Sequence, residues 1–114
     1  MFTPKHTPAA ILIAALLAGY PQTSFAEGFT GSDVLKWKKS SQESYFRTSV
    51  SMAGVIASQN RNEAAQCIDR WYFMDTGTQQ KRANHIRDIM KQYPDHNPQA
   101  VIFAIIRKAC GRLF

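Results

Sequence analysis

The sequence predicts a small all-α protein, a single-domain bundle of four to five helices joined by one disulfide, which follows a signal peptide. Three observations support this prediction. Apolar residues recur at helical spacing, helix start and stop signals separate these runs, and the chain contains two cysteines. Because 88 residues follow the signal peptide, the chain is too short for a two-domain enzyme.

Residues 1–26 have the pattern of a signal peptide. Lys5 supplies the positive charge, residues 9–20 form an apolar core of 12 residues, and small residues precede a cleavage site after Ala26. Twelve apolar residues are too few to span a membrane, which takes roughly 20. We therefore expect export to the periplasm or secretion, and a mature helical domain at residues 27–114.

Two helices are expected first. Ser32 can cap a short helix that has Asp33 in its first turn. Ser40 and Glu43 match a capping box, which predicts a second helix from there to about Ser58. Its predicted apolar face consists of Phe46, Val50, Ala53 and Ala57, widened by Tyr45, Met52, Val55 and Ile56.

The middle of the chain is less well defined. Small residues at Ala53 and Gly54 indicate that another helix packs closely on the second helix. The alanines of residues 63–73 favour a helix, whereas the three aromatic residues at its end could be extended. A turn and an N-cap at residues 75–78 predict a third clear helix over residues 79–93. Its predicted buried face consists of Ile86, Ile89, Met90 and Tyr93.

Residues 93–98 predict a corner between two helices. Pro94 ends one helix, Asn97 caps the next, and Pro98 takes the first helical position, where the missing N–H costs nothing. Gly111 is placed to stop this last helix. The expected buried face of the helix consists of Val101, Ile102, Ile105, Ile106 and Ala109.

Both cysteines, Cys67 and Cys110, lie in the mature chain and would reach an oxidising compartment on export. A disulfide between them closes a loop of about 44 residues and should stabilise the fold by roughly 4 kcal/mol. A nucleophilic cysteine is the less favoured alternative, because oxidation would silence it. A metal site is less favoured still, because neither cysteine belongs to a CxxC pair.

The mature chain carries 13 basic and 8 acidic residues, a net charge of +5. The positive residues are dispersed, which favours a solvated basic surface, or an acidic partner or anionic envelope surface, over nucleic acid. No glycine-rich phosphate loop suggests a cofactor, and His85 and His96 lack the spacing of a metal pair. We therefore expect a protein that is not an enzyme and holds no metal.

Two segments have the composition of a protein-binding surface, in which aromatic and arginine side chains are common. Residues 70–75 offer Trp71 and Tyr72 beside charged residues, and residues 93–98 offer Asp95 and His96 at the rigid corner. These four residues are the predicted partner contacts. The alternative is that the aromatic residues belong to the core and the corner is only a helix connection.

The chain also resembles a known family. The pattern from Cys67-Ile68, through a helix ending at Tyr93-Pro94, to a last helix ending at Ala109-Cys110 is similar to the Rap/Tai-type immunity proteins. These are small exported helical proteins of Gram-negative bacteria that neutralise toxins of type VI secretion systems. Residues 31–35 and 52–55 also look like the first helices of that family.

The resemblance implies a protein that covers the active site of a periplasmic toxin, such as a cell-wall amidase, with a loop or corner as the plug. The alternative is a periplasmic acid-stress chaperone of the HdeA type, which is also small, exported, helical and tied by one disulfide. A small hydrolase is a distant third hypothesis. The sequence leaves the oligomeric state open, and a homodimer is one of the states it allows.

Overall fold

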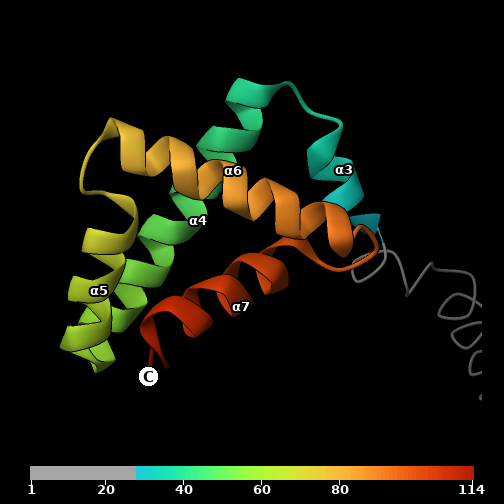
Figure 1. Cartoon of the computed structure of the whole chain (residues 1–114). Helices are drawn as coiled ribbons and strands as arrows, with labels where there is room; N and C mark the ends of the chain where they lie inside the picture. The colour runs from blue at the N-terminus through green and yellow to red at the C-terminus, as the bar shows by residue number, and fades with distance from the viewer. Residues whose placement is uncertain (1–27) are drawn as a thin grey trace, which may run out of the picture.

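The computed structural model describes residues 28–114, so the predicted signal peptide lies outside the described residues. This part of the chain is all-α and contains the Cys67–Cys110 disulfide. Its helices, labelled in Figure 1, are α3 (Gly31–Leu35), α4 (Lys39–Asn60), α5 (Asn62–Tyr72), α6 (Thr76–Gln92) and α7 (Pro98–Cys110). These features confirm the predicted fold class.

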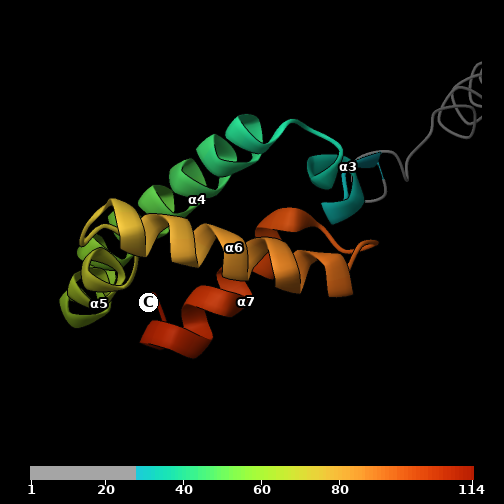
Figure 2. The ribbon, with the colours of Figure 1, turned by 45° about the horizontal axis from the view of Figure 1, so that its top comes forward.

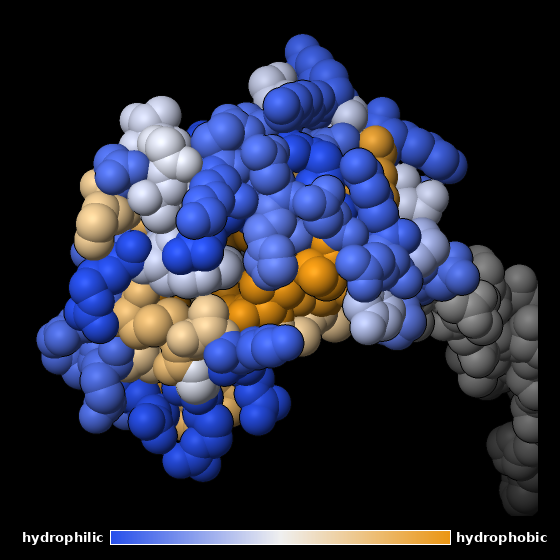
Figure 3. All heavy atoms as spheres, viewed as in Figure 1, coloured by the Kyte–Doolittle hydropathy of each residue, from blue (hydrophilic) through white to orange (hydrophobic). Residues whose placement is uncertain are grey.

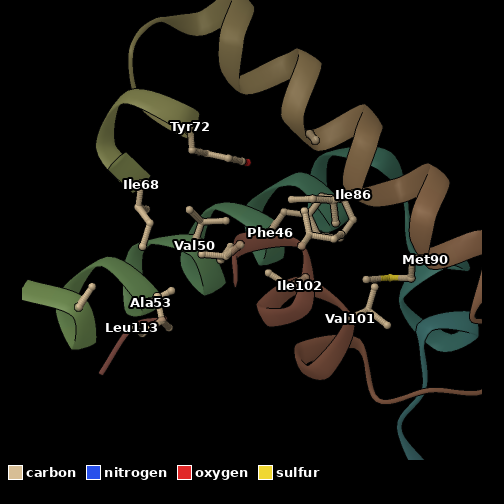
Figure 4. Packing of buried hydrophobic residues seen from close by; sticks show 14 of the residues in the cluster. Phe46, Val50, Ala53, Ile68, Tyr72, Ile86, Met90, Val101, Ile102 and Leu113 are labelled. Atoms are coloured by element: carbon tan, nitrogen blue, oxygen red, sulfur yellow. The ribbon is translucent and has the colours of Figure 1, made fainter. Parts of the chain in front are cut away.

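The long helix α4 is the centre of the bundle. Figures 1 and 2 show α5 lying alongside its C-terminal half, while α6 and α7 contact it from another side. All five helices contribute to one hydrophobic core, part of which is drawn in Figure 4. The largest fully buried residues are Val34, Phe46, Val50, Ile68, Tyr72, Ile86, Met90, Pro98, Ile102 and Ile106.

The predicted face of α4 is only partly buried. Its four central residues, from Phe46 to Ala57 at helical spacing, are fully buried as expected. Met52 and Val55, however, were expected to widen this face and are 54 % and 56 % exposed. The reason is that the neighbouring helices cover one stripe of α4, and these two side chains lie outside it.

Two predicted helix starts were wrong. The short helix α3 is capped by Thr30 rather than Ser32, and Thr30 forms a capping box with Asp33: the Thr30 amide donates to Oδ2 of Asp33 at 2.9 Å. Helix α4 begins at Lys39 without a side-chain cap, so Ser40 is already helical. Neither helix has a serine cap, although serines near both starts match the capping pattern.

The middle helices begin and end differently from the expectation. The ambiguous segment is helical to Tyr72, because Ala64, Ile68 and Tyr72 form a buried stripe at a spacing of four residues. Helix α6 begins at Thr76, three residues earlier than predicted. Its N-cap is Asp75, whose Oδ1 accepts a hydrogen bond from the Thr78 amide at 2.7 Å, and this bond lowers the pKa of Asp75.

The corner between α6 and α7 has the predicted geometry. Oδ1 of Asn97 accepts from the amides of Gln99 and Ala100 at 2.8 and 3.2 Å, and Pro98 occupies the first turn. At the other end of α7, Gly111 adopts a φ of +84°, a left-handed conformation that glycine tolerates best. Two residues expected to be buried, Tyr93 and Ala109, are instead exposed.

Helix α3 holds this corner in place through backbone hydrogen bonds. The Gly31 amide donates to the His96 carbonyl at 2.8 Å, and the Ser32 amide donates to the Pro94 carbonyl at 2.9 Å. A helix N-terminus has unpaired amides that need such partners. The corner is therefore fixed by contacts with a segment more than 60 residues earlier in the chain, in addition to its two prolines.

Replacing both Cys67 and Cys110 with alanine should lower the free energy of unfolding by about 4 kcal/mol. The reason is that the disulfide links two residues separated by 43 positions and so restricts the unfolded chain. Urea denaturation followed by circular dichroism measures the change. Intact mass with and without reduction provides the control for bond formation. Two thiols that alkylate without prior reduction would show that the bond does not form.

Gly31→Ala should destabilise the protein by about 1–3 kcal/mol, because an added Cβ would lie 2.7 Å from the buried Met90 Cγ and 3.4 Å from the Tyr93 oxygen. Gly54→Ala is the matched control. Its Cβ would contact Ile68 Cγ2 at an ordinary 3.7 Å, and removing a glycine from a helix interior stabilises by up to about 1 kcal/mol. Equal urea midpoints for the two variants would contradict the close approach of α3 to α6.

Candidate functional site

One of two surface hollows of equal volume lies between α6 and α7, and we call it the α6–α7 groove. It has a volume of about 480 Å³ and is mostly apolar. Figure 3 shows the same feature as an orange band between the blue surfaces of the two helices. The groove is lined by Ile89, Gln92, Tyr93, His96, Ala100, Val101, Ala104, Ile105 and Lys108.

A second hollow lies on the other side of α7, and we call it the C-terminal hollow. It also has a volume of about 480 Å³. Ala100 and Ala104 border both hollows, so a low ridge of small side chains separates them. The C-terminal hollow is lined by Ala100, Phe103, Ala104, Arg107, Arg112, Leu113 and Phe114.

Helix α7 is the element that creates both hollows. Val101, Ile102, Ile105 and Ile106 fill the core, while Ala100, Phe103 and Ala104 lie on its other side and are exposed or half-buried. A helix that is apolar on every side is normally buried on every side. Part of α7 therefore presents apolar surface that the described residues leave uncovered.

The corner contributes two of its residues to the groove. Tyr93 and His96 line its end, and their rings meet edge to face with centroids 5.2 Å apart. Asp95 is exposed at the same corner but does not line the groove. The structure thus brings His96 to an apolar surface and places Asp95 beside it, while the backbone bonds to α3 hold both.

The other predicted contact segment belongs largely to the fold. Tyr72 is 2 % exposed and points inward from α5 in Figure 4, and burial raises the pKa of its hydroxyl. Tyr72 therefore belongs to the core in this structure, which is the alternative that the sequence left open, and a partner contact at this residue stays a prediction. Its spacing of four residues from Ile68 was the signal that could have placed it in the core.

Trp71 is half-buried and is held by Arg82 of α6. The Arg82 guanidinium carbon lies 5.1 Å from the centroid of the indole ring, and its Nε donates to the Trp71 carbonyl at 2.8 Å. These contacts fix the junction between α5 and α6. Trp71 is separate from the α6–α7 groove, so the structure does not bring the two predicted contact segments into one site.

The largest polar cluster links α4 to α6. Arg87 donates from Nε to Gln42 Oε1 at 2.7 Å and forms an ion pair with Glu43 at 3.2 Å. Gln42 is buried and donates to the carbonyls of Leu35 and Trp37. Together these groups tie the α3–α4 junction to α6, so the cluster acts as a structural link.

Glu43 is the carboxylate of that link. Gln80 donates to its Oε2 at 3.1 Å, and this bond, followed by the contact with Arg87, holds the pKa of Glu43 below its ordinary value of 4.5. The carboxylate therefore stays ionised at neutral pH and keeps α4 and α6 together.

Other groups that could carry chemistry are dispersed. Both cysteines are in the disulfide, and His85 lies exposed on α6. Among residues 28–114, no cluster of three or more His, Cys, Asp or Glu side chains could hold a metal ion. Within the same range, no helix is both long and apolar enough to cross a membrane.

Sequence reasoning missed the groove itself. The expected buried faces of α6 and α7 included Ile89, Tyr93 and Ile105, but neither Ala100 nor Ala104, which also line the groove. The available signal was the uninterrupted apolar run from Ala100 to Ile106, which is wider than one buried stripe requires.

Comparison of the sequence with known protein families and with curated proteins gives no match, and comparison of the fold with solved structures gives none either.

Proposed function

We propose that this protein is a small exported binding protein, without enzymatic activity, that covers a functional surface of another protein. The observation that carries this proposal is the exposed apolar α6–α7 groove between two fixed helices. Exposed apolar patches on small proteins commonly mark interaction sites. The proposed site consists of the groove and the adjoining corner, residues 93–98.

The rigidity of the site supports binding by preformed shape. The corner carbonyls of Pro94 and His96 are bonded to α3, and Cys110 ties the end of α7 to α5. Arg87 ties α6 to α4. Because these contacts already order the site, little conformational entropy is lost when a partner binds.

In its most specific form, the proposal is that of an immunity protein. The chain would bind a periplasmic toxin, such as a cell-wall amidase, and insert the corner at the active site of that enzyme. This form rests on the resemblance to Rap/Tai-type proteins and on a projecting corner that presents Asp95 and His96.

Ala104→Arg should weaken binding of such a toxin by at least about tenfold, because it places a large charged side chain in the groove. Ala104 is exposed, so we expect the melting temperature to be unchanged. The test is co-expression, in the periplasm, with a cell-wall amidase encoded beside this chain. Cell lysis and the dissociation constant of the purified pair are the readouts.

Ala109→Arg is the matched control, because it makes the same exposed change on the same helix outside the groove. We expect it to protect as the unmodified protein does. If Ala104→Arg also protects fully and binds as tightly, the groove is not the binding site. If the unmodified protein neither binds the amidase nor prevents lysis, the immunity role is wrong.

The second candidate is the acid-stress chaperone, and one contact favours it. Glu43 links α4 to α6 through Arg87 and Gln80, and protonation of its carboxylate would remove the charged part of this link. Acid would thereby loosen α6 and could expose more of the apolar core.

The pKa of Glu43 is lower in the folded protein than in the unfolded chain. The ionised carboxylate therefore stabilises the fold at any pH above its unfolded-state pKa. This stabilisation is lost as the pH falls through its folded-state pKa. We expect Glu43→Gln to cost up to about 1 kcal/mol at pH 7, because the pair is partly exposed, and the cost should be smaller at pH 3, which lies below the ordinary glutamate pKa of 4.5. Urea denaturation at both pH values measures it.

A difference that persists unchanged at pH 3 would contradict this assignment of the pKa. The same acid samples also test the chaperone directly. If the protein keeps a cooperative fold and does not delay aggregation of an unfolded client at low pH, the chaperone hypothesis fails.

A further inference from the structure

We infer that the α6–α7 groove and the adjoining C-terminal hollow together receive one acidic amphipathic helix of the partner protein. This inference rests on the proposed function and names the chemistry of the segment that the groove would bind. It follows from the apolar floor of the site, the low ridge of α7 and the positive charge at one end.

The floor can accommodate apolar side chains. Ile89, Val101 and Ile105 line the α6–α7 groove, and Phe103 lines the C-terminal hollow. Burying apolar side chains in two hollows of about 480 Å³ each removes apolar surface of both proteins from water. Apolar anchors are therefore the first requirement for the bound segment.

The ridge favours a helix as the bound element. Ala100 and Ala104 are one turn apart on α7 and border both hollows. Small side chains allow another backbone to approach closely, and residues at positions i, i+3, i+4 and i+7 of a bound helix could reach into a groove of this kind. Helix α7 itself has 13 residues, which corresponds to a length of about 20 Å for such contacts.

The charge at one end of the site favours an acidic segment. Arg107 and Arg112 line the C-terminal hollow, Lys108 lines the groove, and all three are exposed. No aspartate or glutamate among residues 28–114 lines either hollow. None of the three has a carboxylate within ion-pair distance, because the single ion pair of residues 28–114 is Arg87–Glu43.

The dipole of α7 gives a partial structural reason for these cations, since Arg107 and Lys108 lie in its last turn. Arg112 lies beyond the helix end and is not explained in this way. The nearest acidic residues along the chain, Asp88 and Asp95, are exposed but line neither hollow. The site is thus complementary in charge to carboxylates on the partner.

The experiment uses two synthetic amphipathic peptides of about 18 residues, long enough to form a helix. Both have leucines on one face, and the polar positions that flank this face are glutamate in one peptide and lysine in the other. Fluorescence anisotropy with the mature, disulfide-bonded protein at low salt measures both dissociation constants. We expect the glutamate peptide to bind about tenfold more tightly than the lysine peptide, which is the effect of two or three exposed charge pairs. We expect 0.5 M salt to remove most of this preference, because salt screens exposed charges.

A triple variant then locates the charge. Arg107→Gln, Lys108→Gln and Arg112→Gln together should abolish the preference for the glutamate peptide. The matched control replaces Lys36, Lys38 and Lys39 by glutamine, which removes the same net charge from exposed positions outside the two hollows. This control should keep the preference, and Ala104→Arg should abolish binding of both peptides.

Three results would overturn the inference. The first is equal binding of the two peptides, or loss of the preference in both triple variants. The second is a concentration-dependent dimer that Ala104→Arg dissociates, because a second copy would then occupy the groove. The third is binding to anionic phosphatidylglycerol vesicles through the same residues without a preference between peptides.

These outcomes are separate from a failure of the proposed function. If the amidase binds and Ala104→Arg weakens it, while the peptides show no charge preference, the binding site stands and the acidic-helix inference is wrong.

Discussion

The first two amides of α3 donate to the carbonyls of His96 and Pro94, and the position of the α6–α7 groove depends on these bonds. They satisfy a helix N-terminus and at the same time fix the corner from which α6 and α7 diverge (Figure 1). Gly31 is the residue that permits this contact, because a side chain there would meet Met90 in the core. A segment at the beginning of the domain thus determines the geometry near its other end.

Two further contacts tie the same helices to other parts of the bundle. The Cys67–Cys110 disulfide joins the end of α7 to α5, and the contacts of Arg87 with Gln42 and Glu43 join α6 to α4. Helices α6 and α7 are therefore each fixed to the rest of the bundle independently of the contacts between them. This arrangement allows a groove between them to stay open without collapse of the fold, which is a requirement for a preformed binding site.

The sequence allowed accurate prediction of features that depend on local chemistry. Asn97 and Pro98 begin α7, Gly111 ends it, and the spacing of apolar residues identifies most of the core.

The predictions that failed concern features that depend on tertiary contacts. Several Ser and Thr residues could cap the first helix, and the bonds of Gly31 and Ser32 to the corner begin α3 after Thr30. Tyr72 was predicted at the surface because three adjacent aromatic residues cannot share one face, but helical spacing buries the middle one. The groove could not be predicted, because its walls come from residues on two helices whose separation is set by α3, α4 and α5.

The exposed apolar side of α7 is difficult to explain by folding alone. The core already contains four large residues of this helix. Phe103 is half-buried against the edge of the core, while Ala100 and Ala104 are exposed on the same side of the helix. Small domains have a high ratio of surface to volume, so uncovered apolar area increases the risk of self-association. The basic residues at the end of α7 reduce this risk by charge repulsion between copies, and they leave the same surface attractive to a partner of opposite charge. The combination of an apolar groove with a positive border is the feature on which the proposed binding of another protein rests.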